Sequence, residues 1–298
     1  MTLPEAVFLV LAALAAVAAW AAVARRWLGR RPLMAYQPRR PVPWRGIDVA
    51  VLVATYGLMP FLVMHVAQDW FGMEPPVEAR AQRANTEHPV GRVLLERPGV
   101  SAVLVSVALA AIVAPLVEEL LFRLLLQGWF ESLERRSRRG ARLCRPFMAG
   151  VVPVTLVALL FAGIHFREPE PVSMPTIVYF QNVQLVASLL TVGVLIGWLR
   201  FAVGATFEDL GIVRSKLMAD IKLGLVALAA TLAPIYGVAT VAKALLPAGV
   251  VADPIPLFPL ALVLGILYYR THRIVPAIVM HMGFNAAAVL LALSTTPS

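Results

Sequence analysis

Two adjacent glutamates and an arginine interrupt the apolar stretch APLVEELLFRLLLQGWF at residues 114–130. If this stretch is an α-helix, Glu119 and Arg123 lie one turn apart with the acid first, which is the favourable order for an ion pair. Glu118 is rotated from Glu119 by about 100° around the helix axis. One carboxylate can then be held by the arginine while the other is free for chemistry. A purely structural ion pair, beside a second glutamate that faces a polar crevice, would explain the same three residues.

Two histidines and an asparagine lie in other apolar stretches. His165 is close to the end of LLFAGIHF, and His281 and Asn285 share one helical face of VMHMGFNAA. His165 could simply be a buried side chain whose polar atoms are hydrogen-bonded, and an interhelical hydrogen bond would explain His281 and Asn285. Combined with a glutamate, however, these residue types can activate a water molecule. A carboxylate acts as general base, and imidazoles hold the water or a metal ion. An asparagine can donate to a developing oxyanion, which is worth about 3 kcal/mol for one donor.

The composition places these residues in a membrane. The chain has 298 residues, of which 60% are hydrophobic and 14% charged, whereas a soluble domain is about 45–50% apolar and about 25% charged. A charge at mid-bilayer costs a few kcal/mol and therefore usually faces a bundle interior, where it has a function. The net charge of +9 comes from short basic blocks between apolar runs. Such blocks are typical of topology signals, so no nucleic-acid partner is expected.

Other functional classes lack their motifs. The chain contains no H-E-x-x-H, no G-x-S-x-G and no P-loop, which are the signatures of common metalloproteases, serine hydrolases and nucleotide-binding enzymes. Its single cysteine, Cys144, excludes an intrachain disulfide and a cysteine-based metal cluster.

Eight apolar stretches are long enough for membrane-spanning helices of roughly 20 residues. They lie at about 4–24, 47–67, 100–128, 147–166, 177–202, 220–246, 255–270 and 274–293. The sequence therefore predicts an all-α fold, a polytopic membrane helical bundle of about eight transmembrane helices. The first stretch is longer than the roughly 7–15 apolar residues of a signal peptide, and its basic cluster follows it, so we expect an uncleaved anchor.

Arginine-rich blocks occur in alternate connections between the predicted spans. They lie at 25–31, 135–145, 200–222 and 270–273, whereas the connections at 68–98, 167–176 and 247–256 contain more acid and proline. Because arginine-rich loops stay in the cytoplasm, both chain termini are expected on the other side of the membrane.

The three polar motifs together resemble those of the CPBP family. This family contains the CAAX prenyl proteases of the Rce1 type and bacterial bacteriocin-processing relatives, and it is also called the ABI family. The matching segments are EELLFR at 118–123, FAGIH at 161–165 and HMGFN at 281–285. The resemblance implies an intramembrane endopeptidase, metal-dependent or glutamate-dependent, in a bacterial inner (cytoplasmic) membrane. Its partners would be the lipid bilayer and a peptide or membrane-protein substrate, which is membrane-associated or lipid-modified.

The resemblance also implies a role for each polar residue. Glu118 would activate the water, and Glu119 with Arg123 would shape the site. The FAGIH histidine would bind the metal or the water, and the two polar residues of HMGFN would ligate the metal or stabilise the oxyanion. Zn²⁺ is the candidate cofactor, with Glu118, His165 and His281 as its ligands. The candidate catalytic residues are Glu118, Glu119, Arg123, His165, His281 and Asn285.

The resemblance divides the chain into two parts. Residues 1–99 would form N-terminal membrane helices and an extracytoplasmic loop, and residues 100–298 the catalytic membrane core. In the family the FxxxH and HxxxN motifs are usually close in sequence, whereas here their histidines are 116 positions apart, so an extra helix pair is expected at about 177–246. Two other functions fit the same residues: a non-catalytic scaffold or bacteriocin self-immunity protein, and a proton-coupled transporter. Nothing in the sequence specifies an oligomeric state.

Overall fold

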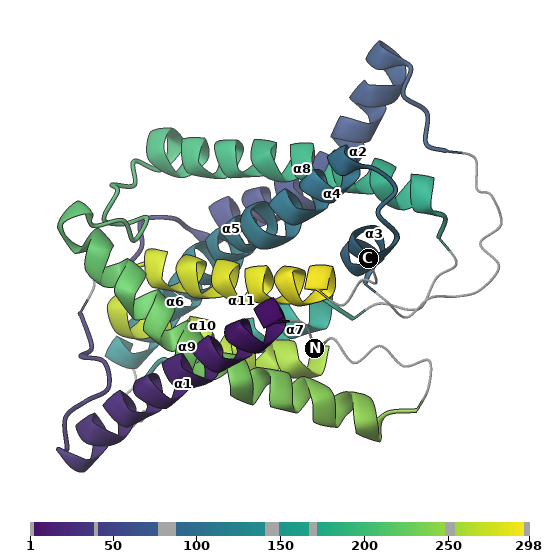
Figure 1. The fold of residues 1–298 in the computed structure, drawn as a ribbon. Helices are drawn as coiled ribbons and strands as arrows, with labels where there is room; N and C mark the ends of the chain where they lie inside the picture. Colours follow the sequence, from purple (N-terminus) through teal and green to yellow (C-terminus); the bar gives the residue numbers. More distant parts are fainter. Residues whose placement is uncertain are drawn as a thin grey trace.

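The computed structural model of the protein consists of helices and their connections (Figure 1). It describes residues 3–38, 41–76, 88–140, 149–166, 172–247 and 254–294, the side chains of 3–9 and 138–140 excepted, and these residues contain no strand. The long helices are α1 (Leu3–Leu28), α2 (Gly46–Phe71), α8 (Met174–Gly197), α9 (Leu217–Leu245), α10 (Pro254–Thr271) and α11 (Val275–Ser294). Shorter elements are α3 (Pro89–Glu96), α7 (Val151–Ile164), the π-helical turn η4 (Trp198–Ala202) and the 3₁₀ turn η5 (Arg214–Lys216). The all-α prediction is confirmed.

A composite helix carries the Glu-Glu-x-x-x-Arg motif and is π-helical in two places. It runs through α4 (Val100–Ala108), η1 (Leu109–Val113), α5 (Ala114–Glu118), η2 (Glu119–Gln127) and α6 (Gly128–Gly140), of which η1 and η2 are π-helical. Pro115 has no N–H to donate, and beside it the N–H of Ala114 donates to the carbonyl oxygen of Leu109, five residues back. π-Helical turns are rare and occur frequently at functional sites.

Seven helical segments of the described chain are long and apolar enough to cross a membrane, so the protein is an integral multi-pass membrane protein. They correspond to seven of the eight predicted spans. The eighth, predicted at about 147–166, is α7, which has only 14 residues. At 1.5 Å per residue α7 reaches about 21 Å, less than the roughly 30 Å of a hydrocarbon core. It follows Gly150, whose φ of 79° is left-handed, and it ends before His165.

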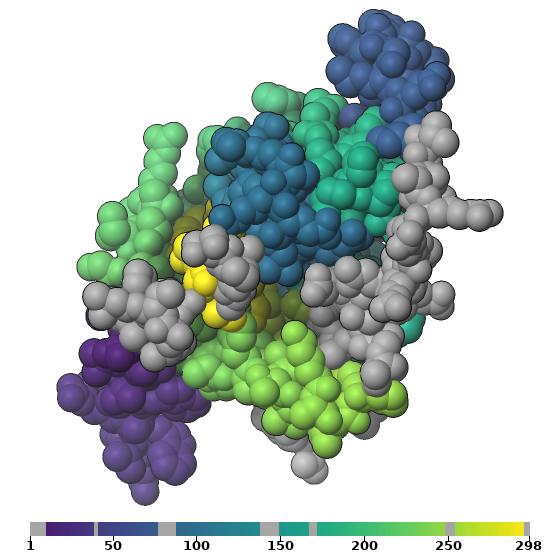
Figure 2. Space-filling view, turned by 45° about the vertical axis from the view of Figure 1, so that its right-hand side comes forward, coloured from purple at the N-terminus to yellow at the C-terminus, as the bar shows by residue number. Residues whose placement is uncertain are grey.

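The composite helix lies in the core of the bundle. Its residues 120–122, 124 and 125 are at most 6% exposed, and α7, α10 and α2 pack around η2. α8 packs against α2 and α5, and α11 packs against α9 and η1. Glycines allow a close approach of α9 and α11, because a Cβ at Gly224 would lie 2.7 Å from the carbonyl oxygen of Pro276. α1 packs on α9 at the edge of the bundle, as Figure 2 also shows.

The connections between helices gather at two ends of the bundle (Figure 1). The ends of α1, α6, α8 and α10 and the starts of α2, α7, α9 and α11, which flank the arginine-rich blocks of the sequence, lie at the left in Figure 1, and we call this the basic end. The ends of α2, α7 and α9 and the starts of α3, α8 and α10 lie at the other end, the distal end. Segments 39–40, 77–87, 141–148, 167–171 and 248–253 between these helices lie outside the described residues. The alternation predicted from the sequence is therefore present, with the short α7 counted as one passage.

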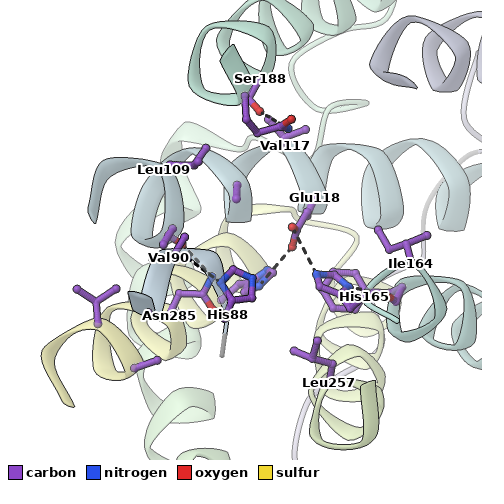
Figure 3. Close-up of a pocket in the computed structure, with 18 of the residues that line it drawn as sticks. His88, Val90, Leu109, Val117, Glu118, Ile164, His165, Ser188, Leu257 and Asn285 are labelled. Carbon is purple, nitrogen blue, oxygen red and sulfur yellow. Dashed lines mark hydrogen bonds and ion pairs between the residues drawn. The ribbon is translucent and has the colours of Figure 1, made fainter. Parts of the chain in front are cut away.

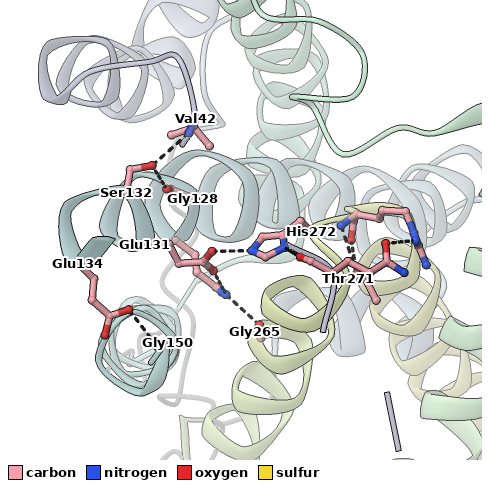
Figure 4. A network of polar contacts seen from close by, with 12 residues as sticks. Val42, Gly128, Glu131, Ser132, Glu134, Gly150, Gly265, Thr271 and His272 are labelled. Carbon is pink, nitrogen blue, oxygen red and sulfur yellow. Dashed lines mark hydrogen bonds and ion pairs between the residues drawn. The ribbon is translucent and has the colours of Figure 1, made fainter. Parts of the chain in front are cut away.

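Buried polar contacts join the chain segments at the basic end (Figure 4). The His272 ring lies between the carbonyl oxygen of Gln37, at 2.7 Å, and Glu131 Oε2, at 3.1 Å. Gln127 Nε2 donates to Glu131 Oε1 at 3.0 Å and to the carbonyl oxygen of Gly265 at 2.9 Å. These contacts connect the α1–α2 segment and the α10–α11 corner to the composite helix.

Candidate active site

A cavity of about 580 Å³ lies between the composite helix, α3, α7, α8 and α11 (Figure 3). Most of its lining is apolar. Four of the six predicted residues, Glu118, His165, His281 and Asn285, line this cavity together. The structure thus brings together side chains that are up to 167 residues apart in the sequence. The other two predicted residues lie behind the cavity wall.

The Glu118 carboxylate lies between the rings of His165 and His281, and Figure 3 shows it pointing into the cavity beside His165. Its Oε1 is 3.7 Å from His165 Nε2, and its Oε2 is 3.6 Å from His281 Nε2. Both distances exceed the roughly 3.2 Å of a direct N–H···O hydrogen bond, and polar groups at such separations are commonly bridged by water. The Glu118 side chain is 15% exposed, so water in the cavity can reach it.

The second nitrogen of each histidine ring contacts an acceptor. His165 Nδ1 is 2.7 Å from the carbonyl oxygen of Phe161, which can only accept, so Nδ1 carries the hydrogen. His281 Nδ1 is 2.9 Å from Glu119 Oε1, and an ionised carboxylate selects the same tautomer. In the neutral rings both Nε2 lone pairs therefore face Glu118. The space between these acceptors favours a hydrogen-bond donor such as water.

Glu119 and Arg123 form the ion pair that the sequence spacing predicts. Arg123 Nε is 3.5 Å from Glu119 Oε2, and both side chains are 0% exposed. The guanidinium also lies over the Phe161 ring, 5.3 Å from its centroid. Its nitrogens have no hydrogen-bond partner among the described residues. Glu119 is thus held by Arg123 and His281, while Glu118 faces the cavity, which is the division predicted for the two acids.

The end of α7 positions His165. This residue follows the last helical residue with φ −89° and ψ 0°, a backbone region in which many active-site residues occur. One turn earlier, the buried Phe161 ring lies 4.7 Å from the His165 ring and 5.7 Å from the His281 ring, between centroids. Phe161 therefore packs against both imidazoles and fixes the space between them.

Asn285 connects α11 to the π-helical turn η1. In π-helical geometry the carbonyl of Ala110 would pair with the N–H five residues on, at Pro115, which has none. Asn285 Nδ2 donates to this carbonyl oxygen at 2.9 Å. One amide hydrogen of Asn285 therefore has a structural role, and the second remains for the cavity that Asn285 lines.

Comparison with known proteins supports the resemblance seen in the sequence. A family model described as type II CAAX prenyl endopeptidase Rce1-like matches residues 100–207 and 211–287, which is more than half of the chain. The chain belongs to this Rce1-like family. Proteins of this family are typically proteases. No curated protein and no solved structure matches the chain.

The Rce1-like match begins at residue 100, the predicted start of the core, and it runs through 177–246 except for 208–210. This region, which we interpreted as an added helix pair, forms most of α8 and α9. α8 contributes Gln184 and Ser188 to the cavity, and α9 supports α11 from the outside. That the pair is an addition to the family core, and that the chain divides at residue 99, stay predictions.

Sequence reasoning missed four polar residues of this Rce1-like site: Tyr56, His88, Gln184 and Ser188, all of which line the cavity. Gln184 Nε2 donates to Ser188 Oγ at 3.2 Å. Polar side chains inside the predicted spans 47–67 and 177–202 were an available signal for three of them. His88, which precedes α3, has no such signal. Tyr56 and His88 lie outside the segments that the family model matches.

The described residues do not provide the donor set that the predicted zinc site requires. Within the described chain no group of three His, Cys, Asp or Glu side chains is arranged to hold a metal ion, although Glu118, His165 and His281 face one another. The Nδ1 contacts of the histidines resemble those that orient metal ligands, but they orient rings that bind water equally well. We therefore derive no step through a metal, and zinc binding stays a prediction.

Proposed function

We propose that the protein is an intramembrane endopeptidase that hydrolyses a peptide bond of a membrane-associated or lipid-modified substrate in a bacterial cytoplasmic membrane. Glu118 is the general base for a water molecule. The observation that carries the proposal is the convergence of His165 Nε2 and His281 Nε2 on the Glu118 carboxylate, at 3.7 and 3.6 Å. Membership of a family of proteases supports it.

The chemistry requires one proton to move twice. Water donates one hydrogen bond to Glu118 and the other to a histidine Nε2, and Glu118 removes the proton that it accepts as the water oxygen attacks the carbonyl carbon of the scissile bond. The tetrahedral intermediate carries a negative oxygen, to which the second amide hydrogen of Asn285 donates. Glu118 then returns the proton to the leaving nitrogen, and the C–N bond breaks. The products are a carboxylic acid and an amine.

Glu119 and Arg123 orient the reacting groups. The Glu119 carboxylate accepts from His281 Nδ1 and so keeps Nε2 of this ring as an acceptor towards the water. Arg123 offsets the negative charge of Glu119 within the apolar core, where an unpaired charge would be costly. The water is activated inside the bundle, where electrostatic interactions are stronger than in bulk solvent.

Hydrolysis can be tested with purified protein in detergent and a library of membrane-anchored peptides, with the products analysed by mass spectrometry in H₂¹⁸O. Wild-type protein should create new carboxyl termini that contain one ¹⁸O atom, and Glu118→Gln should create none. The matched control is Glu208→Gln, the same change on an exposed turn at the basic end, which should cleave like the wild type. Equal cleavage by Glu118→Gln would contradict the proposal. Absence of cleavage by the wild type across the library would favour the scaffold or self-immunity alternative.

A further inference from the structure

We propose that the cavity opens at the extracytoplasmic surface of the membrane, so that its substrates are extracytoplasmic segments of membrane-anchored or exported proteins. This inference deepens the proposed peptidase function and rests on it. Two features that are independent of each other carry it: the position of the cavity mouth and the distribution of charge along the chain.

The cavity extends from the centre of the bundle to the distal end. α7 contributes only residues of its last turn and the following His165, α10 contributes only Pro256 and Leu257 from its first turn, and α11 contributes as far as Ala292. On the composite helix no lining residue follows Glu118. α3, at the distal end in Figure 1, packs beside α11, α4 and α8 and forms part of the rim. Figure 2, which turns this end forward, shows α3 and α4 on the near face.

Towards the basic end the bundle is closed. Arg123, Leu124 and Leu125 on the composite helix are 0% exposed, whereas the His165 side chain near the mouth is 25% exposed. Beyond these residues lies the buried network of Glu131 and His272 (Figure 4). Water and substrate therefore reach Glu118 from the distal end.

The short length of α7 explains why the mouth lies there. α7 starts at the basic end and covers about 21 Å of a hydrocarbon core of about 30 Å, which leaves a recess of about 9 Å at the distal surface. Ile164 and Phe166, at the end of α7, are 54% and 67% exposed. At the rim, Arg92 of α3 donates to the carbonyl oxygen of Val172 at 2.7 Å. A peptide at this surface can enter the recess without crossing the rest of the bundle.

The charge of the chain assigns the two ends to the two sides of the membrane. Nineteen of the 26 lysines and arginines fall in the sequence segments 25–45, 131–150, 200–222 and 270–273, whose described parts lie at the basic end. Segments rich in lysine and arginine stay in the cytoplasm. The basic end therefore faces the cytoplasm, and the distal end with the cavity mouth faces the other side.

Cysteine labelling tests the side of access, because Cys144 is the only cysteine of the chain. In a Cys144→Ser background, Gly91→Cys places a thiol at the rim, where a Cβ meets no atom within 4 Å. Ala114→Cys places one inside the cavity, one turn before Glu118. Spheroplasts that carry each variant are treated with MTSET, a small thiol reagent that does not cross membranes. Wild-type protein, with Cys144 in the basic α6–α7 connection, is the control for the cytoplasmic side.

We expect MTSET to modify Gly91→Cys and Ala114→Cys in intact spheroplasts, and Cys144 only after lysis. Modification of Ala114→Cys only after lysis, or in neither condition, would overturn the proposal, and so would modification of Cys144 in intact spheroplasts. The labelling is repeated in a Glu118→Gln background, where it should be unchanged. Loss of turnover with normal labelling contradicts only the proposed function, whereas labelling from the wrong side contradicts the access route.

Discussion

The buried pair of Glu119 and Arg123 predicts a strong energetic coupling. Their charged atoms are 3.5 Å apart and both side chains are 0% exposed. At an effective dielectric constant of about 20, unit charges at this distance attract each other by about 5 kcal/mol. Removing one partner of a buried pair costs about 3–5 kcal/mol, because the remaining charge is uncompensated. Arg123→Met and Glu119→Gln should each lower the free energy of unfolding by about this amount.

The double variant tests the reason for this loss. Glu119→Gln combined with Arg123→Met removes both charges, so its cost should fall short of the sum of the single costs by about 2 kcal/mol or more. Unfolding of the four proteins by SDS in mixed micelles measures this difference. The control is the same double-mutant cycle on Arg92 and Glu96, an ion pair of equal spacing at 3.2 Å with Glu96 half exposed, for which about 0.5 kcal/mol is expected. Costs that simply add for Glu119 and Arg123 would refute the reasoning.

Three further predictions concern packing, the site and zinc. Gly224→Ala should destabilise by about 1–3 kcal/mol, because its methyl group meets the backbone of α11. Gly237→Ala is on the same helix, and its methyl group would meet no atom within 4 Å, so it should be neutral or stabilising by up to about 1 kcal/mol. Thermal unfolding in detergent compares the two variants. An equal loss of stability in both would contradict the packing argument. Asn285→Ala should cost about 1–3 kcal/mol in the same assay, because the Ala110 carbonyl loses its donor, and unchanged stability would show that this bond contributes nothing. Metal analysis of purified protein tests the zinc site that the resemblance implies: one zinc per chain that is lost in His165→Ala would contradict a site that works with water alone, and absence of zinc would contradict the predicted zinc site.

Several features of the site were predictable because they depend on local geometry. Four residues are close to one turn in both α- and π-helices, so the Glu119–Arg123 pair forms although η2 is π-helical. The rotation between neighbouring residues places the Glu118 carboxylate in the cavity while Glu119 is buried. Apolar runs also marked the helices well, because a bilayer requires long apolar segments.

Other features depend on contacts between distant segments. Apolar residues on both sides of Gly150 predicted a full span at 147–166, but Ala149 and Gly150 form a turn and α7 starts only at Val151. Hydropathy does not detect such a turn. An interhelical hydrogen bond of Asn285 was one of the interpretations, but its acceptor, Ala110, is determined by a π-helical turn that has no clear sequence signal.

The central claim is that Glu118 activates the water that cleaves the substrate. The most direct measurement is the kcat of Glu118→Gln relative to wild type on a cleaved peptide, with unfolding of both proteins measured in the same detergent. General-base catalysis contributes about 10²–10⁴-fold, so kcat should fall by at least this factor, while Glu208→Gln keeps the wild-type rate. A folded Glu118→Gln protein that retains the wild-type kcat would contradict the account.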